Sequence, residues 1–225
     1  QKYIQQPITD CKISGATELS FHKTWLQTFP MEVTELTHLR ALKLLMNGVR
    51  TIPNELANLK ALKVLQLTHN PLTHVPEVIR QMSQLEELDL SECELVEIPE
   101  WIGELQNLRA LGIGYNHFTR LPESIGLLQN LEELELSHME AMEDGAPLIE
   151  GLLPSLAPLT HLKKVDLSDN GLTEVPPLLQ SFTQLEELDL AWNSGITHIP
   201  PWMRNLASLH TIGLNYLATL ELSGL

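Results

Sequence analysis

Residues 39–61 read LRALKLLMNGVRTIPNELANLKA, and residues 62–84 continue directly with LKVLQLTHNPLTHVPEVIRQMSQ. Both 23-residue stretches place Leu, Asn and Pro at matching positions. Further copies of the pattern begin at Leu85, Leu108, Leu131, Leu162, Leu185 and Leu209, and a degenerate copy begins at Ala16. The spacing is 23 residues throughout, except for 31 residues after Leu131 and 24 residues after Leu185. Repetition at a fixed period indicates that one small structural unit is stacked nine times.

The alternating leucines of each copy predict a short strand. In Leu42-x-Leu44 the two side chains fall on the same face, which must be buried, while the residues between and around them point to the other face. Strands of successive copies should pair in parallel, about 4.8 Å apart. We therefore predict strands near 19–21, 42–44, 65–67, 88–90, 111–113, 134–136, 165–167, 188–190 and 212–214.

The remainder of each copy predicts how the chain leaves the strand and returns. An Asn follows most strands and can hydrogen-bond the backbone of the turn; these residues are Asn47, Asn70, Asn116, Asn170 and Asn193. The later Ile-Pro pair fixes φ at the start of a short return segment, whose Leu-x-x-Leu spacing fits one stripe of a helix or 3₁₀ turn. A single unit cannot bury its leucines, so the stack predicts a solenoid.

The full pattern, LxxLxLxxNxLxxIPxxLxxLxx, resembles the leucine-rich-repeat family over residues 16–225. It is most similar to the 23-residue class found in intracellular Ras-group repeat proteins, Roco GTPases and bacterial effectors. The resemblance implies an α/β solenoid with a curved parallel sheet on its concave face and short helices or 3₁₀ turns on its convex face. It also implies a cytoplasmic protein-binding scaffold, which for a secreted effector would act in the host cytosol. Residues 1–15 would form an N-terminal flank or cap.

Two units depart from this pattern. The unit that begins at Leu131 carries eight extra residues within 140–151 and has Met139 at the ladder position. We expect this insertion to be more mobile than a regular unit, or to form a short helix that projects beside the concave face. Cys93 takes the ladder position in its own unit.

Composition narrows the classes of partner. The 225 residues are 43% hydrophobic and carry 29 Asp and Glu against 14 Lys and Arg, a formal net charge of −15. Residues 1–80 contain nine basic and six acidic residues, whereas residues 81–225 contain five and 23. This charge disfavours nucleic acid and anionic membrane surfaces as partners, and no apolar run reaches the length of a membrane span. Cys11 and Cys93 have neither disulfide-framework nor metal-site spacing, so we expect reduced thiols.

The sequence carries no direct signal for an enzyme. It lacks the P-loop, GxGxxG, HExxH, GxSxG and CxxC motifs. His69 and His138 occupy the same repeat position but lie three units apart, about 14 Å at strand spacing, which is too far to share an ion. We therefore expect no catalytic residue, cofactor or metal. Gly112 and Gly114 flank a strand residue, so they predict a shallow trough in the concave face rather than a phosphate cradle.

The exposed strand positions predict the binding surface. From Leu85 onward they are acidic and are punctuated by aromatic residues; the candidate partner-binding residues are Glu87, Asp89, Glu92, Tyr115, Glu133, Glu135, Asp166, Asp169, Glu187, Asp189, Trp192 and Tyr216. Like charges on neighbouring strands, such as Glu133 and Glu135 beside Asp166 and Glu187, should repel unless a partner or solvent relieves them. An alternative is that Leu-Glu-Glu-Leu-Asp/Glu-Leu is only a soluble consensus, which also discourages edge pairing. Trp101 and Trp202 should pack between convex segments instead.

These observations favour a non-enzymatic module that holds a basic protein segment in its concave face. The alternative is a targeting or autoinhibitory domain of a larger catalytic protein, such as an effector ubiquitin ligase or a Roco GTPase. The identity of the partner, the organism and the oligomeric state stay open at the level of sequence, as does the question whether residues 215–225 form a C-terminal cap.

Overall fold

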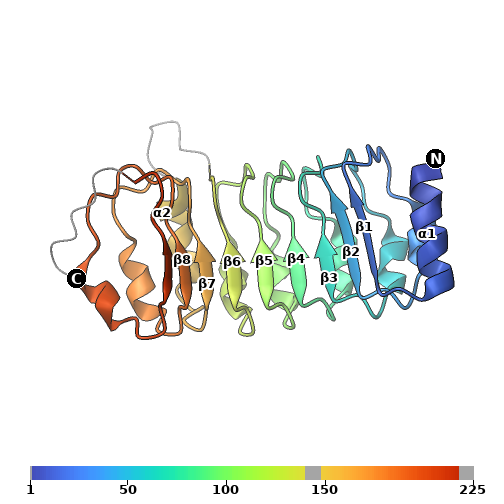
Figure 1. Cartoon of the computed structure of the whole chain (residues 1–225). Helices are drawn as coiled ribbons and strands as arrows, with labels where there is room; N and C mark the ends of the chain where they lie inside the picture. Colours follow the sequence, from blue (N-terminus) through green and yellow to red (C-terminus); the bar gives the residue numbers. More distant parts are fainter. Residues whose placement is uncertain (1, 140–147, 218–225) are drawn as a thin grey trace.

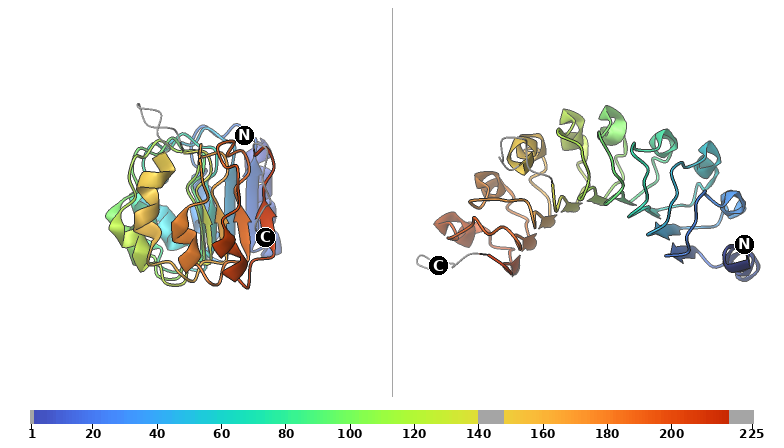
Figure 2. Two further views of the ribbon diagram at one scale, coloured as in Figure 1. Left: turned by 90° about the vertical axis from the view of Figure 1, so that its left-hand side faces the viewer. Right: turned by 90° about the horizontal axis from the view of Figure 1, so that it is seen from above.

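The computed structural model describes residues 2–139 and 148–217. Within them, the repeats form one nine-stranded parallel sheet whose strands neighbour one another in chain order (Figure 1). The strands are β1 (Glu18–His22), β2 (Ala41–Leu45), β3 (Val64–Gln66), β4 (Glu87–Asp89), β5 (Ala110–Gly112), β6 (Glu133–Glu135), β7 (Lys164–Asp166), β8 (Glu187–Asp189) and β9 (Thr211–Gly213). Figure 2 shows the sheet along the inside of an arc and the helical segments along its outside. The predicted solenoid is confirmed.

The observed strands begin one residue before the predicted ones, and β3 to β9 also end one residue earlier. The reason is that the backbone turns at the second leucine of each Leu-x-Leu. Leu67, for example, follows β3, although its N–H still donates to the Asp89 carbonyl at 2.8 Å. The register is regular, with Leu42 opposite Leu65 and Leu65 opposite Leu88.

Each return segment on the convex side is a single 3₁₀ helix that begins directly after a proline in seven of the eight described units. The segments are η1 (Met31–Glu35), η2 (Asn54–Asn58), η3 (Glu77–Gln81), η4 (Glu100–Glu104), η5 (Glu123–Leu127), η6 (Leu153–Leu156), η7 (Pro177–Ser181) and η8 (Pro201–Asn205). Pro53, with φ −72° and ψ 152°, sets the extended entry into η2. Trp101 is buried and donates to Glu77 Oε2 in the preceding segment at 2.9 Å, which confirms its packing role.

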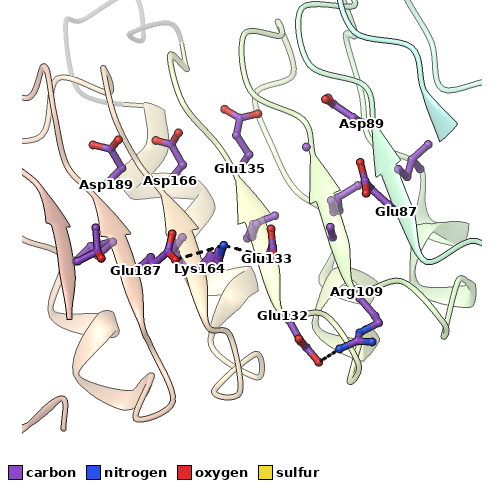
Figure 3. A pocket seen from close by; sticks show the side chains of 18 of the residues that line it. Glu87, Asp89, Arg109, Glu132, Glu133, Glu135, Lys164, Asp166, Glu187 and Asp189 are labelled. Atoms are coloured by element: carbon purple, nitrogen blue, oxygen red, sulfur yellow. Dashed lines mark hydrogen bonds and ion pairs between the residues drawn. The ribbon is translucent and has the colours of Figure 1, made fainter. Parts of the chain in front are cut away.

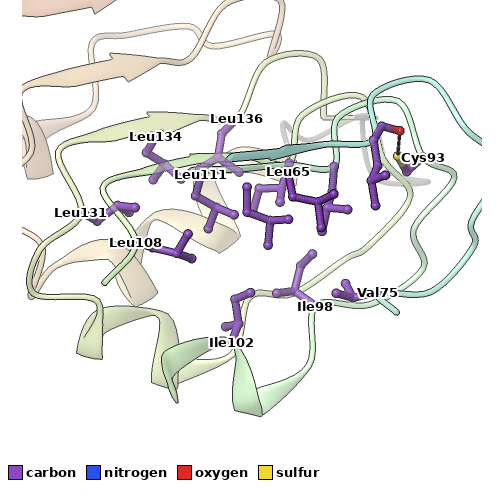
Figure 4. Packing of buried hydrophobic residues seen from close by; sticks show 14 of the residues in the cluster. Leu65, Val75, Cys93, Ile98, Ile102, Leu108, Leu111, Leu131, Leu134 and Leu136 are labelled. Atoms are coloured by element: carbon purple, nitrogen blue, oxygen red, sulfur yellow. Dashed lines mark hydrogen bonds between the residues drawn. The ribbon is translucent and has the colours of Figure 1, made fainter. Parts of the chain in front are cut away.

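The core lies between the sheet and the convex segments. Leu111 and Leu134 enter it from neighbouring strands, and Ile98 and Ile102 enter it from the opposite side (Figure 4). These side chains are almost fully buried, as are their equivalents in the other units. Each buried leucine contributes about 1.5–3 kcal/mol relative to an exposed one, so the stacking of units is what stabilises the chain.

The asparagine ladder connects successive units. Asn116 Oδ1 accepts hydrogen bonds from the N–H groups of Cys93 (3.0 Å) and Leu95 (2.9 Å), both in the preceding unit. Its Nδ2 donates to the Leu90 and Ile113 carbonyls at 3.0 and 2.8 Å. Asn116 is buried, so the amide satisfies backbone groups that water cannot reach.

Both substitutions in the ladder are accommodated in the core. Cys93 is fully buried, and its Sγ lies 3.2 Å from the Leu67 carbonyl oxygen (Figure 4). Met139 is also buried, and its N–H donates to Asn170 Oδ1 at 2.9 Å, so the next unit still completes the ladder there.

The N-terminal flank is helical. Helix α1 (Lys2–Ser14) packs beside β1 at the end of the solenoid, with Ile8 and Cys11 buried against it (Figure 1). Lys12 and Gln5 on the same helix hydrogen-bond to acidic side chains of η1. Thus α1 covers apolar side chains of the first unit.

The predicted insertion lies partly outside the described residues, namely at 140–147. Its last four residues belong to helix α2 (Leu148–Leu152), whose two leucines and isoleucine are buried. Figure 2 shows α2 on the convex side of the arc. For this part, the expectation of a helix that projects beside the concave face is wrong, because its apolar side chains pack into the core.

Candidate functional site

The concave face carries a groove of about 690 Å³ that crosses the sheet from β3 to β9 (Figure 3). Nine carboxylates and two cationic side chains line it. They are Glu86, Glu87, Asp89, Glu132, Glu133, Glu135, Asp166, Glu187 and Asp189, with Arg109 and Lys164. The groove therefore presents an excess of negative charge to any molecule that enters it.

The candidate residues fall into three rows that run across the strands. The first row holds the first residue of each strand and includes Glu87, Glu133 and Glu187. The second row holds the third residue of each strand from β3 to β9, and includes Asp89, Glu135, Asp166 and Asp189. The edge row lies three residues beyond the second row and includes Glu92, Tyr115, Asp169, Trp192 and Tyr216. All twelve predicted residues thus lie on the concave face or at its edge.

The first row is not a run of like charges, which corrects one premise of the sequence analysis. The register places Lys164 between Glu133 and Glu187, so the two glutamates are not neighbours. Lys164 Nζ lies 3.3 Å from Glu187 Oε1 and 3.9 Å from Glu133 Oε1 (Figure 3). The hydrogen bond to Glu187, followed by the charge of Glu133, raises the pKa of the Lys164 ammonium.

The second row does bring like charges into register, with Glu135 opposite Asp166 and Asp166 opposite Asp189. These carboxylates are occupied by the backbone. Asp166 Oδ1 accepts the N–H of Ser168 at 2.8 Å, and Asp189 Oδ1 accepts the N–H of Ala191 at 2.8 Å. Asp89 makes the same bond to Ser91 at 3.0 Å. Each acid therefore satisfies an N–H group at the end of its own strand, a structural role that the sequence analysis missed.

Glu135 makes the most contacts in this row. Its Oε1 accepts hydrogen bonds from the N–H and the hydroxyl of Ser137, and its Oε2 accepts from Ser91 Oγ at 2.7 Å and from the Gly114 N–H at 3.0 Å. Ser91 lies two units before Glu135 in the chain. One carboxylate thus ties together three successive units.

The glycines predicted to form a trough make room for these carboxylates. A Cβ on Gly112 would lie 2.8 Å from Asp89 Oδ1, and a Cβ on Gly114 would lie 2.3 Å from Glu135 Oε1. Gly213 is equivalent, since its Cβ would approach Asp189 Oδ1 to 2.3 Å. The space above β5 is therefore filled by acidic side chains from the neighbouring units.

Every residue of the edge row has a left-handed backbone. The nine residues have φ between 49° and 61°, although none is glycine; they are Lys23, Met46, His69, Glu92, Tyr115, His138, Asp169, Trp192 and Tyr216. From Lys23 to Trp192, the N–H of each residue except Met46 bonds to the carbonyl directly before the equivalent residue of the next unit, and Met46 bonds to the equivalent Thr68 carbonyl. This conformation costs a non-glycine residue about 1 kcal/mol or more, and the ladder bonds offset the cost.

Side chains of neighbouring edge-row residues pair with one another. His69 Nδ1 lies 2.7 Å from Glu92 Oε2, and His138 Nδ1 lies 2.6 Å from Asp169 Oδ2. The His138 ring also stacks on Tyr115, with centroids 4.3 Å apart and planes 7° apart. Desolvation, with a smaller effect from surrounding carboxylates led by Asp169, raises the pKa of the Tyr115 phenol. The sequence predicted the row but not these pairs.

Trp192 and Tyr216 form a second stack, at the C-terminal end of the row. Their ring centroids are 3.8 Å apart and the planes differ by 19°. The two side chains are nevertheless 55% and 67% exposed, which is unusual for large aromatic residues.

Two searches of the described residues bear on other kinds of site. In residues 2–139 and 148–217, no group of three or more His, Cys, Asp and Glu side chains could hold a metal ion. Over the same ranges, none of the helices has the length and apolar character needed to cross a membrane.

Solved structures with a similar fold come from bacteria and plants. A leucine-rich-repeat protein of Leptospira interrogans is 30% identical with a TM-score of 0.68; the match covers 94% of this chain but 58% of that one. Internalin C2 of Listeria monocytogenes is 25% identical with a TM-score of 0.67, covering 91% and 83%. The repeat ectodomain of the Arabidopsis receptor kinase HAESA, solved with a peptide hormone ligand, is 26% identical with a TM-score of 0.66, covering 87% and 33%.

Family models match most of the repeats. The model described as leucine-rich repeat region matches residues 19–113 and 54–153, and the model described as leucine-rich repeat matches residues 161–182 and 184–206. No curated protein sequence matches the chain. The matched residues include the strands, the asparagine ladder and the Ile-Pro segments described above, and the chain belongs to the leucine-rich-repeat family.

Proposed function

We propose that this chain is a non-catalytic recognition domain that holds a basic segment of a partner protein in its concave groove. The observation that carries the proposal is the lining of the groove, with nine carboxylates against two cationic side chains. Such a surface speeds encounter with a basic ligand and disfavours an acidic one. The HAESA ectodomain, which has a similar fold, is seen with a peptide ligand, and this supports a peptide or protein partner.

The first row is the part of the groove that is available to a partner. Glu133 and Glu187 have side chains 52% and 41% exposed, and their printed contact is the shared Lys164. A partner lysine or arginine can therefore compete with Lys164 without breaking a backbone hydrogen bond. The second-row acids differ, because they also accept backbone N–H groups.

We further propose that the chain belongs to the 23-residue intracellular class and acts in the cytosol, which would be the host cytosol if it is a bacterial effector. The same recognition role would serve a free-standing scaffold or the targeting part of a larger protein. The repeat length and the pattern around Cys93, which replaces the ladder Asn without a cysteine-rich cap nearby in sequence, support this class.

Binding of a fluorescent octalysine peptide, measured by anisotropy, tests the groove. We compare a groove variant, Glu87→Gln with Glu133→Gln and Glu187→Gln, with a convex control, Glu55→Gln with Glu100→Gln and Glu123→Gln. Both variants lose three negative charges, and the control residues are exposed in the first turns of η2, η4 and η5.

The groove variant should bind octalysine about tenfold or more weakly, because each exposed ion pair contributes about 0.2–1 kcal/mol. The control should change by about twofold at most, and both affinities should fall as salt rises. Equal weakening of the two variants, or no binding of octalysine to the unaltered chain, would refute the proposal.

A further inference from the structure

The stacked pair of Trp192 and Tyr216 is not explained by the fold. The same left-handed backbone position holds Lys23, Met46 and Asp169 in other units, so the conformation does not require an aromatic ring. Neither ring is part of the buried core. Two large aromatic side chains that are more than half exposed usually mark a surface where another molecule is bound.

The pair also differs from the other aromatic stack in the edge row. In the Tyr115 and His138 stack, the imidazole is held by Asp169 at 2.6 Å, so that its polar atom is already engaged. Trp192 and Tyr216 contact one another through ring faces. Because Tyr216 covers one face of the Trp192 indole, the opposite face is left on the side of the preceding unit, whose residue in this row is Asp169.

The charges around this platform are negative. Asp169 precedes Trp192 in the edge row, and Asp189 lies three residues before it in the second row of the groove. The Gly213 position, which carries no side chain, leaves the Asp189 carboxylate uncovered on the Tyr216 side. An aromatic face beside carboxylates is the environment that attracts a cationic side chain.

Resting on the proposed function, we infer that the Trp192 and Tyr216 platform is the subsite for an arginine side chain of the partner's basic segment. Arginine fits better than lysine, because its planar guanidinium stacks on a ring while its edge N–H groups reach carboxylates such as Asp169 and Asp189. The platform would thus distinguish between two residues that the groove charge alone treats alike.

Octaarginine and octalysine peptides, which carry equal charge, test this subsite. The platform variant is Trp192→Leu with Tyr216→Leu. The matched control is Trp25→Leu, since Trp25 is also a tryptophan with a left-handed backbone (φ 57°) and is 82% exposed, but it lies in the first unit. Trp192→Phe, which keeps a ring, serves as the conservative variant. Thermal melting of all variants checks that they fold.

We expect the unaltered chain and Trp25→Leu to bind octaarginine about tenfold more tightly than octalysine, and the platform variant to lose most of that ratio. Trp192→Phe should retain most of it. An unchanged ratio in the platform variant would overturn the subsite; if octalysine binding still fell in the groove variant, the proposed function would survive. Equal loss of both peptides in the platform variant would also overturn it, because it would indicate general apolar contact. If neither peptide bound the unaltered chain, both proposals would fall.

Discussion

The Glu135 carboxylate accepts a hydrogen bond from the backbone N–H of Gly114, which belongs to the preceding unit, at 3.0 Å. In other units this N–H group is satisfied by an acid two residues earlier in the same strand, as Asp166 does for Ser168. Gly112 stands at that position and has no side chain to offer. An acid that seems free to bind a partner is therefore part of the framework that shapes the groove.

Replacing Glu135 should lower stability, although it lies on the exposed face. Glu135→Ala removes the acceptor for the N–H groups of Gly114 and Ser137, so we expect the free energy of unfolding to fall by about 1–3 kcal/mol. Glu133→Ala is the control and should change it by about 0.5 kcal/mol or less. Urea denaturation followed by circular dichroism measures both, and equal effects would contradict the assigned role.

Asn116→Ala should destabilise the solenoid more strongly. The buried N–H groups of Cys93 and Leu95 lose their acceptor, and each such loss costs about 1–3 kcal/mol. The exposed Asn54 in η2 provides the control, Asn54→Ala, with little expected change. Hydrogen exchange should show faster exchange at the Cys93 and Leu95 amides in particular. Unchanged protection at both amides would be inconsistent with the ladder.

Cys93 should make stability depend on alkaline pH. Burial raises the pKa of its thiol from 9.0 to about 12. The folded chain thus holds this proton more tightly than the unfolded chain, and the stabilisation is complete below pH 9 and is lost as pH rises toward 12. Relative to Cys93→Ala, the native chain should lose about 2 kcal/mol by about pH 10.5. Parallel pH profiles of the two proteins would show that the thiol is not buried.

Helix α1 is proposed to cap the N-terminal end of the solenoid. Ile8→Ala removes a side chain buried beside β1, so we expect a loss of about 2 kcal/mol or more. Ile13 lies on the same helix but is 80% exposed, and Ile13→Ala should have almost no effect. If the two variants melted at the same temperature, α1 would be packed too loosely to act as a cap.

The fold could be predicted from the sequence because each unit repeats the same buried pattern. Leu42, Leu65 and Leu88 occupy one repeat position and lie opposite one another in the sheet, so period and register are linked. The role of Asn116 followed in the same way, since it depends on backbone groups present in every unit. Small shifts in strand bounds aside, these features depend on local spacing alone.

The chemistry of the groove was only partly predictable. The sequence places Glu133, Lys164 and Glu187 in one row, yet the relief of their charges depends on a single cation reaching both neighbours. The contact between Glu135 and Ser91 spans two units and depends on the absence of side chains at Gly112 and Gly114, which could have served as a signal. Side-chain reach across units is not contained in the repeat period.

The uniform left-handed backbone of the edge row has a consequence for how such a surface diversifies. Seven residue types occupy its nine positions with φ between 49° and 61°, so any non-glycine exchange leaves the backbone cost nearly the same. Exchange therefore alters what the edge recognises while the spacing of about 4.8 Å between positions stays fixed. The edge behaves as a string of interchangeable letters on a rigid line, and a new partner requires new letters but no new scaffold.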